Sequence, residues 1–138
     1  MLDLGFVTAI FADDDFETVL EFAAKNRFAC VEVMCWPKGK AERRYAGVTH
    51  IDVTQLSDTE IKKIKSLQKK TSVSISGLGY YPNPLVADEK EAGVYIEHIK
   101  RVITASAKLG IGVMNTFIGR DPAKSIKDNW VLFDERWP

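Results

Sequence analysis

Short apolar runs alternate with longer segments of helical periodicity along the chain, and this alternation constrains the fold most strongly. Between the runs, apolar residues recur three and four positions apart, as on one face of an amphipathic helix. Strands that alternate with helices form parallel sheets with right-handed crossovers. The sequence therefore predicts an α/β protein. Its strands are expected over residues 4–9, 29–35, 72–78 and 111–117.

The beginnings of the first two helices carry capping signals. Asp14 is followed three residues later by Glu17, and Ser57 is followed by Glu60 at the same spacing. In such a capping box each side chain satisfies a backbone N–H that the first helical turn leaves free. Asp14 and Ser57 are therefore predicted to be the N-cap residues.

The two later helices are marked by a stop signal and by periodicity. A third helix is expected from about residue 88 to Leu109, with Gly110 in the left-handed conformation that ends many helices. Trp130, Phe133 and Trp137 follow one another at i, i+3 and i+7. This spacing predicts a fourth amphipathic helix from residue 130 onward.

The second strand has two different faces. Val31 and Val33 share one face, whereas Glu32 and Met34 share the other, and alternation also places Leu78 of the third strand on the inward wall. One apolar face under helices and one partly polar face fit a barrel wall better than an open doubly wound sheet, which remains the alternative. Complete barrels of this type have about 250 residues. Residues 1–138 are therefore expected to form a single domain, the (βα)4 half of a TIM barrel.

The charge balance and the cysteines of the chain indicate which partners it could bind and in which cellular compartment it would be found. Lys plus Arg and Asp plus Glu number 19 each, so no global field favours nucleic acid. No apolar run is long enough to span a membrane, and Met1 leads into a strand rather than a signal peptide. Cys30 and Cys35 lie on opposite faces of one expected strand and cannot bridge each other. Two unpaired cysteines favour the reducing cytoplasm.

Barrel enzymes carry their active sites on the loops that follow the strands, and several polar or aromatic residues occupy those positions here. Glu32 is costly to bury unless it is paired or faces a cavity, so it is either a substrate contact or a structural hydrogen-bond anchor. Aromatic residues there either stack on a sugar ring or pack the loops. Arg120 either clamps a phosphate or carboxylate or lies in solvent. The candidate substrate-binding residues are Glu32, Trp36, Tyr80 (with its neighbour Tyr81), Asn115 and Arg120.

The two histidines lie on different elements and do not suggest a metal pair. His98 falls inside the third helix and is expected at the surface or its boundary. His50 falls in the long loop after the second strand, where capping or loop anchoring is expected.

Four short motifs in this order resemble the sugar phosphate isomerase/epimerase family, the xylose-isomerase-like TIM barrels. The likeness covers the whole chain but only the first half of a typical member. The motifs are Cys30-Val31-Glu32-Val33-Met34, His50-Ile51-Asp52-Val53, Ser76-Gly77-Leu78-Gly79 and Asn115-Thr116-Phe117-Ile118-Gly119-Arg120-Asp121.

The resemblance implies a divalent metal (Mn, Mg, Co or Zn) held by Glu, Asp, His and Glu of the later strands. It also implies that two glutamates act as acid and base and transfer a proton by way of an enediolate intermediate. It thus implies the N-terminal half of a metal-dependent sugar or sugar phosphate isomerase or epimerase. An inosose-type dehydratase fragment and a non-catalytic half-barrel assembly module are the alternatives. No metal ligand or catalytic residue can be assigned in this chain.

The related endonuclease IV branch carries histidines at early strand ends, where this chain has none, so a DNA-repair role is disfavoured. The expected partners are a small sugar or cyclitol and either a second copy or a C-terminal half.

Overall fold

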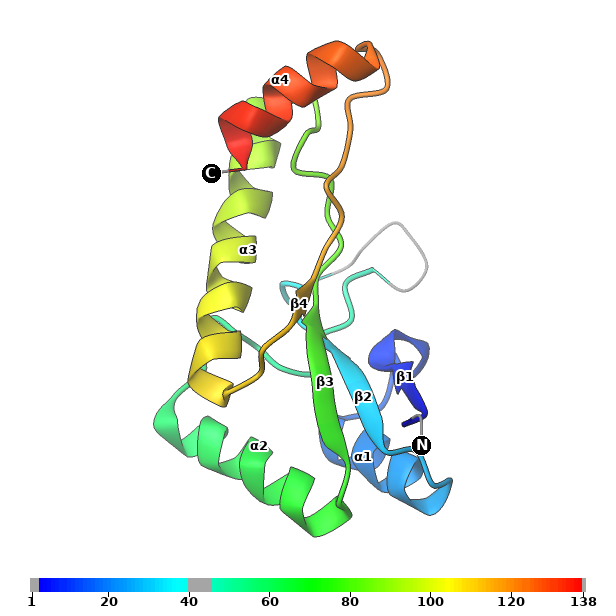
Figure 1. The fold of residues 1–138 in the computed structure, drawn as a ribbon. Helices are drawn as coiled ribbons and strands as arrows, with labels where there is room; N and C mark the ends of the chain where they lie inside the picture. The colour runs from blue at the N-terminus through cyan, green and yellow to red at the C-terminus, as the bar shows by residue number, and fades with distance from the viewer. Residues whose placement is uncertain (1–2, 40–45, 138) are drawn as a thin grey trace.

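Strands and helices alternate along the chain in a computed structural model that describes residues 3–39 and 46–137 (Figure 1). Met1 and Leu2, which bear on the expected absence of a signal peptide, lie outside the described residues. None of the described helices is both long and apolar enough to cross a membrane. The elements are β1 (Gly5–Val7), η1 (Thr8–Ile10), α1 (Phe16–Lys25), β2 (Cys30–Met34), α2 (Asp58–Thr71), β3 (Ser74–Gly79), α3 (Glu89–Leu109), β4 (Met114–Asn115) and α4 (Ile126–Arg136).

The strands form a parallel sheet in the order β1-β2-β3-β4, so each strand pairs with the next one in sequence. One face of this sheet is covered by α1, α2 and α3. Val31 and Val33 are fully buried there and share a core with helical residues such as Leu20 and Ile99. Sequential order with helices on one face is the arrangement of a barrel wall. The prediction of a (βα)4 half-barrel is therefore confirmed.

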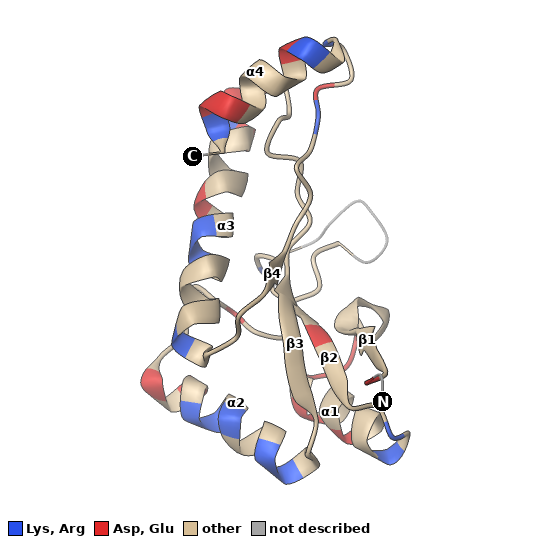
Figure 2. Ribbon diagram, viewed as in Figure 1, with Lys and Arg blue, Asp and Glu red and all other residues tan. Residues whose placement is uncertain are grey.

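Charged residues gather on the helices, whereas Glu32 of β2 is the charged residue within the described strands (Figure 2). This carboxylate lies on the face of the sheet opposite the helical core, with its side chain half-buried. The predicted division of β2 into an apolar and a polar face is thus present in the structure.

The helix ends agree with the sequence signals in part. The Ser57 side chain accepts a hydrogen bond from the Glu60 N–H at 3.2 Å, and Gly110 ends α3 with φ of 76°. For α1, however, the N-cap is Asp15, whose Oδ1 accepts from the Thr18 N–H at 2.8 Å. The expectation of Asp14 was wrong by one residue, because neighbouring aspartates both offer a capping oxygen and only the entry angle of the chain selects one.

The last two elements differ from their predicted bounds. Helix α4 begins at Ile126 because Ser125 caps it, its Oγ accepting from the Asp128 N–H at 3.1 Å. Strand β4 is much shorter than expected. It pairs with Leu78 and Gly79 of β3, and β3 ends at Gly79, so the ladder stops at its carboxyl end after Asn115.

A bulge in β3 decides which side chains face the inner surface. Val31 pairs with Ile75, but Glu32 pairs with Gly77, so one residue of β3 is left over between the two pairs. The bulge moves Leu78 opposite Val33, into the helix-facing core. The expectation that Leu78 faces inward was therefore wrong, since a bulge reverses the alternation beyond it.

Candidate functional site

Glu32 is the centre of a hydrogen-bonded group on the inner face of the sheet. Its Oε1 accepts a hydrogen bond from the Tyr81 hydroxyl, and its Oε2 accepts one from Asn115 Nδ2 at 2.8 Å. Glu32 is the central residue of β2, Tyr81 follows the end of β3 by two residues, and Asn115 is the last residue of β4. The group thus lies toward the carboxyl ends of the strands, where barrel enzymes bind their substrates. We call Glu32, Tyr81 and Asn115 the Glu32 group.

Two glycines of β3 make room for this group. A Cβ atom on Gly79 would lie 2.6 Å from Glu32 Oε1 and 2.2 Å from Met34 Cε. A Cβ atom on Gly77 would lie 3.2 Å from Asn115 Nδ2. A side chain at Gly79 would therefore require the ends of Met34 and Glu32 to move from their present positions.

Protonation fixes the direction of the Tyr81 hydrogen bond. Burial, together with the hydrogen bond to Glu32, raises the pKa of the Tyr81 phenol well above its usual range. At neutral pH the phenol is thus protonated and donates to Glu32. With one donor on each oxygen, the carboxylate is held in a fixed orientation. The remaining lone pairs of the carboxylate and the side-chain amide oxygen of Asn115 are acceptors suited to the hydroxyl groups of a polyol.

An exposed aromatic side chain, Phe117, lies beside the Glu32 group. The Tyr81 ring lies 4.9 Å from the Phe117 ring, centroid to centroid, and the Phe117 side chain is exposed. An exposed aromatic face beside hydrogen-bonding groups is an arrangement that accommodates the apolar face of a sugar ring. This group can therefore bind both the polar edge and the apolar face of such a molecule.

Tyr80 belongs to the helix-facing core, and Trp36 packs both against that core and against an inner cluster that Tyr81 also contacts. Tyr80 is only 1% exposed and packs edge-on against Trp36 at 4.9 Å and against His98 at 4.6 Å. His98 Nε2 lies 2.7 Å from the Cys35 carbonyl oxygen. His98 is buried, so its expected surface position was wrong. The neighbouring Tyr81, named with it in the sequence analysis, is the one that joins Glu32, because the bulge in β3 exchanges the faces of the two tyrosines.

Arg120 lies apart from the group, on the loop between β4 and α4. Its backbone is held by Asn83, which accepts from the Arg120 N–H at 2.9 Å and donates to the Arg120 carbonyl at 2.8 Å. The Arg120 side chain is exposed, and within the described residues it forms no ion pair. Of the five candidates, the structure thus brings together Glu32 and Asn115.

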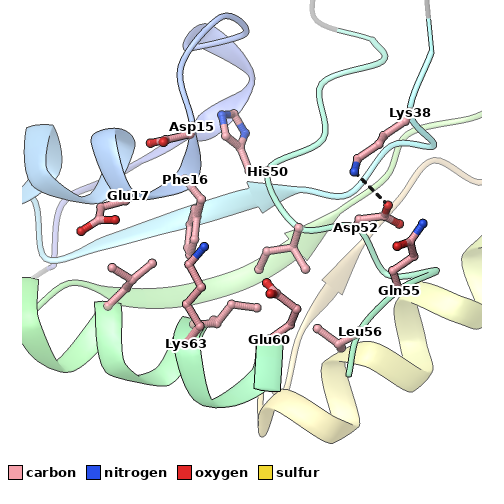
Figure 3. A pocket seen from close by; sticks show the side chains of 13 residues that line it. Asp15, Phe16, Glu17, Lys38, His50, Asp52, Gln55, Leu56, Glu60 and Lys63 are labelled. Atoms are coloured by element: carbon pink, nitrogen blue, oxygen red, sulfur yellow. Dashed lines mark ion pairs between the residues drawn. The ribbon is translucent and has the colours of Figure 1, made fainter. Parts of the chain in front are cut away.

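A cavity of about 430 Å³ lies on the helical side, between α1, α2 and the loop that precedes α2 (Figure 3). His50 lines it, and His50 Nε2 lies 3.1 Å from the Phe11 carbonyl oxygen, so this residue anchors the loop. Burial lowers the pKa of His50. Across the cavity, Lys38 forms an ion pair with Asp52 at 3.3 Å. None of the Glu32 group lines this cavity.

The described residues do not fit a divalent metal. Among them, no cluster of three or more His, Cys, Asp or Glu side chains is positioned to hold an ion. Glu32 contributes a single carboxylate, and both of its oxygens already accept protein hydrogen bonds. A metal site usually needs at least three protein ligands. The metal implied by the sequence resemblance therefore has no ligand set in this part of the chain.

Comparison with solved structures supports the half-barrel fold. The chain matches the "probable 3-DHS dehydratase AsbF involved in the petrobactin synthesis" from Bacillus anthracis with a TM-score of 0.66 and 16% identity, over 98% of this chain and 45% of that one. It matches a protein from Sinorhizobium meliloti 1021 with a TM-score of 0.54 and 15% identity, over 96% of this chain and 42% of that one. The chain thus spans less than half of either structure, and identities this low show the fold alone.

Sequence comparison identifies the family. No curated protein matches the chain significantly. The family model described as "Xylose isomerase-like TIM barrel", however, matches residues 20–137, which include β2, β3, β4 and the whole Glu32 group. The chain therefore belongs to the xylose isomerase-like TIM-barrel family.

Proposed function

We propose that this chain is the N-terminal half of a metal-dependent enzyme that isomerises or epimerises a sugar, a sugar phosphate or a related cyclitol. The observation that carries the proposal is the Glu32 group, an oriented carboxylate with a phenol and an amide at the ends of three neighbouring strands. In barrel enzymes of this type the substrate binds at those strand ends. The metal ligands and the groups that move the proton are proposed to lie on strands beyond this chain.

The Glu32 group binds the substrate in this proposal and does not act as the base. Tyr81 and Asn115 each donate to one Glu32 oxygen and so fix the carboxylate, while its remaining lone pairs can accept from a substrate hydroxyl group. Held in this way, the carboxylate orients a substrate hydroxyl group. Orientation of a reacting molecule against groups on the opposite wall is itself a large contribution to rate.

A lyase is the second candidate. One structure with the same fold is named a probable dehydratase, and elimination of water next to a carbonyl begins with the same proton abstraction as isomerisation. An inosose-type substrate would present the same hydroxyl groups to Glu32. A non-catalytic assembly module is the third candidate, supported by the exposed apolar side chains of Val7, Val113 and Phe117.

We place the protein in a reducing compartment, the cytoplasm. Both Cys30 and Cys35 are free thiols in the structure. The physiological partners in this proposal are the small sugar or cyclitol and the second half of the barrel, supplied by a C-terminal segment or by another copy.

The test is turnover of a panel of ketoses and inososes with added manganese, magnesium or cobalt. We expect no metal-dependent turnover by the chain alone, and turnover when it is combined with a (βα)4 C-terminal half that carries the family's metal ligands. Glu32→Gln should then raise KM while leaving metal content unchanged. Glu97→Gln, on the exposed face of α3, is the matched control.

Two results would contradict the proposal. Turnover by the chain alone, free of host isomerase, would show that the reacting groups lie within it. Loss of bound metal in Glu32→Gln, with the fold intact by circular dichroism, would show that Glu32 is a ligand and not a substrate contact.

A further inference from the structure

A second, mainly apolar cavity lies between α4 and the loop that leads into it. Its volume is about 310 Å³, within the lower range of small-molecule sites. Leu85, at 1% exposure, is a buried part of its lining, whereas Ile126 and Trp130 are largely exposed. We call it the α4 cavity. Its apolar lining residues are Leu85, Ile118, Ile126, Trp130 and Phe133.

The charged residues of the α4 cavity are both cations. Arg120 and Lys124 line it, and no Asp or Glu is among its lining residues. Within the described part of the chain, neither cation forms an ion pair. Two unpaired cations next to an apolar surface offer charge partners to an anion that also carries an apolar body.

The loop that carries these cations is fixed in place. Asn83 holds the Arg120 backbone with bonds of 2.9 and 2.8 Å. Asn129 holds the turn before α4, accepting from the Asp121 N–H at 2.7 Å and donating to the Ser125 carbonyl at 2.9 Å. The far end of α4 is tied down by Arg136, which donates to the Pro84 and Val86 carbonyls at 3.1 and 2.9 Å. A ligand would therefore meet a largely preformed cavity.

Two aromatic side chains, Trp130 and Phe133, line the cavity. Trp130 and Phe133 pack edge to face with their centroids 5.4 Å apart, and the Trp130 side chain is 55% exposed. An apolar body that covers this indole would bury surface that the described chain leaves in water.

We propose that the α4 cavity binds a small organic anion, a carboxylate carried on an aromatic or branched aliphatic body. This site goes beyond the proposed sugar chemistry and is independent of it, because none of the Glu32 group lines the cavity. The carboxylate pairs with Arg120 and Lys124, and the apolar body covers Trp130.

The test is isothermal titration of the 138-residue chain with 3-phenylpropionate as the probe. Two matched compounds separate the two parts of the site: 3-phenylpropylamine keeps the body and reverses the charge, and propionate keeps the charge without the ring. We expect saturable binding of 3-phenylpropionate alone, and the double variant Arg120→Gln, Lys124→Gln should weaken it by about tenfold. Trp130→Ala should weaken it by a similar factor.

The matched control is Arg101→Gln, Lys108→Gln, which removes one exposed arginine and one exposed lysine from α3 and should leave the affinity unchanged. Circular dichroism checks that each variant keeps its helix content. Equal binding of the amine, full affinity in the Arg120 and Lys124 double variant, or no saturable binding of 3-phenylpropionate would each overturn the proposal.

Discussion

Gly79→Ala should destabilise the protein and break the Glu32 group at once. The added methyl group would lie 2.2 Å from Met34 Cε, 2.6 Å from Glu32 Oε1 and 3.1 Å from Tyr81 Cε2. Met34 is only 1% exposed, so its side chain has little room to move away. Glu32 is held by hydrogen bonds to Tyr81 and Asn115, so its movement strains or breaks them.

The magnitude follows from these two effects. Overpacking of a buried site costs about 1 to 3 kcal/mol, and loss of a hydrogen bond to a charged group costs about 1.5 to 3 kcal/mol. Both close contacts are with the ends of flexible side chains, so part of the strain can relax, and we expect the free energy of unfolding to fall by about 1 to 3 kcal/mol. The total stability of such a domain is about 5 to 15 kcal/mol, so the change is easily measured.

The assay is urea denaturation followed by circular dichroism, with Gly93→Ala as the matched control. Gly93 lies inside α3, and a Cβ atom there would meet nothing within 4 Å. The control should therefore gain about 0.5 to 1 kcal/mol from the better helix propensity of alanine. If the free energy of unfolding falls in Gly79→Ala and rises in Gly93→Ala, the space around Gly79 decides the result, and not the loss of a glycine as such.

Two further measurements identify the cause. In a Met34→Ala background the added cost of Gly79→Ala should be smaller, because one of the two closest contacts is gone. In Gly79→Ala itself the pKa of Tyr81 should fall toward its usual value, as seen in the ultraviolet titration of the phenol, because one cause of its raised pKa is the bond to Glu32. A Gly79→Ala variant within about 0.5 kcal/mol of the native protein would refute the close packing described here.

Three other predictions concern thiols, pH and assembly. Burial raises the pKa of the Cys35 thiol far above its usual range, so a thiol reagent should label the half-buried Cys30 well before Cys35; equal rates would contradict this. Burial lowers the pKa of His50 in the folded state, so the unfolded state binds more protons at acid pH. The free energy of unfolding should therefore fall as the pH drops below about 6.5. Urea titrations of His50→Gln at several pH values should show a smaller fall than those of the native protein. Since β1 and β4 are edge strands and Val7 and Phe117 are exposed, the isolated chain should associate at micromolar concentration in light scattering; a cooperatively unfolding monomer that binds no hydrophobic dye would argue against half-barrel assembly.

Much of the architecture was predictable because its signals are local. A helix N-cap such as Ser57 and a left-handed stop such as Gly110 act within one turn of the chain, so neighbouring residues suffice to recognise them. The two faces of β2 follow from strict alternation over five residues. Glu32 was recognisable for the same reason, since a carboxylate in an apolar strand needs a partner or a cavity.

The partners of Glu32, in contrast, were decided by the tertiary structure. Asn115 lies 83 residues away in sequence and reaches Glu32 only because β4 pairs with β3, which pairs with β2. Tyr81 takes the place expected for Tyr80 because the bulge in β3 reverses the alternation beyond Ile75, and a bulge depends on the neighbouring strand as well as on its own residues. The sequence by itself determined the order of the elements and the one unusual carboxylate. Only the folded sheet determined which side chains that carboxylate meets, because strand register is a property of two segments and not of one.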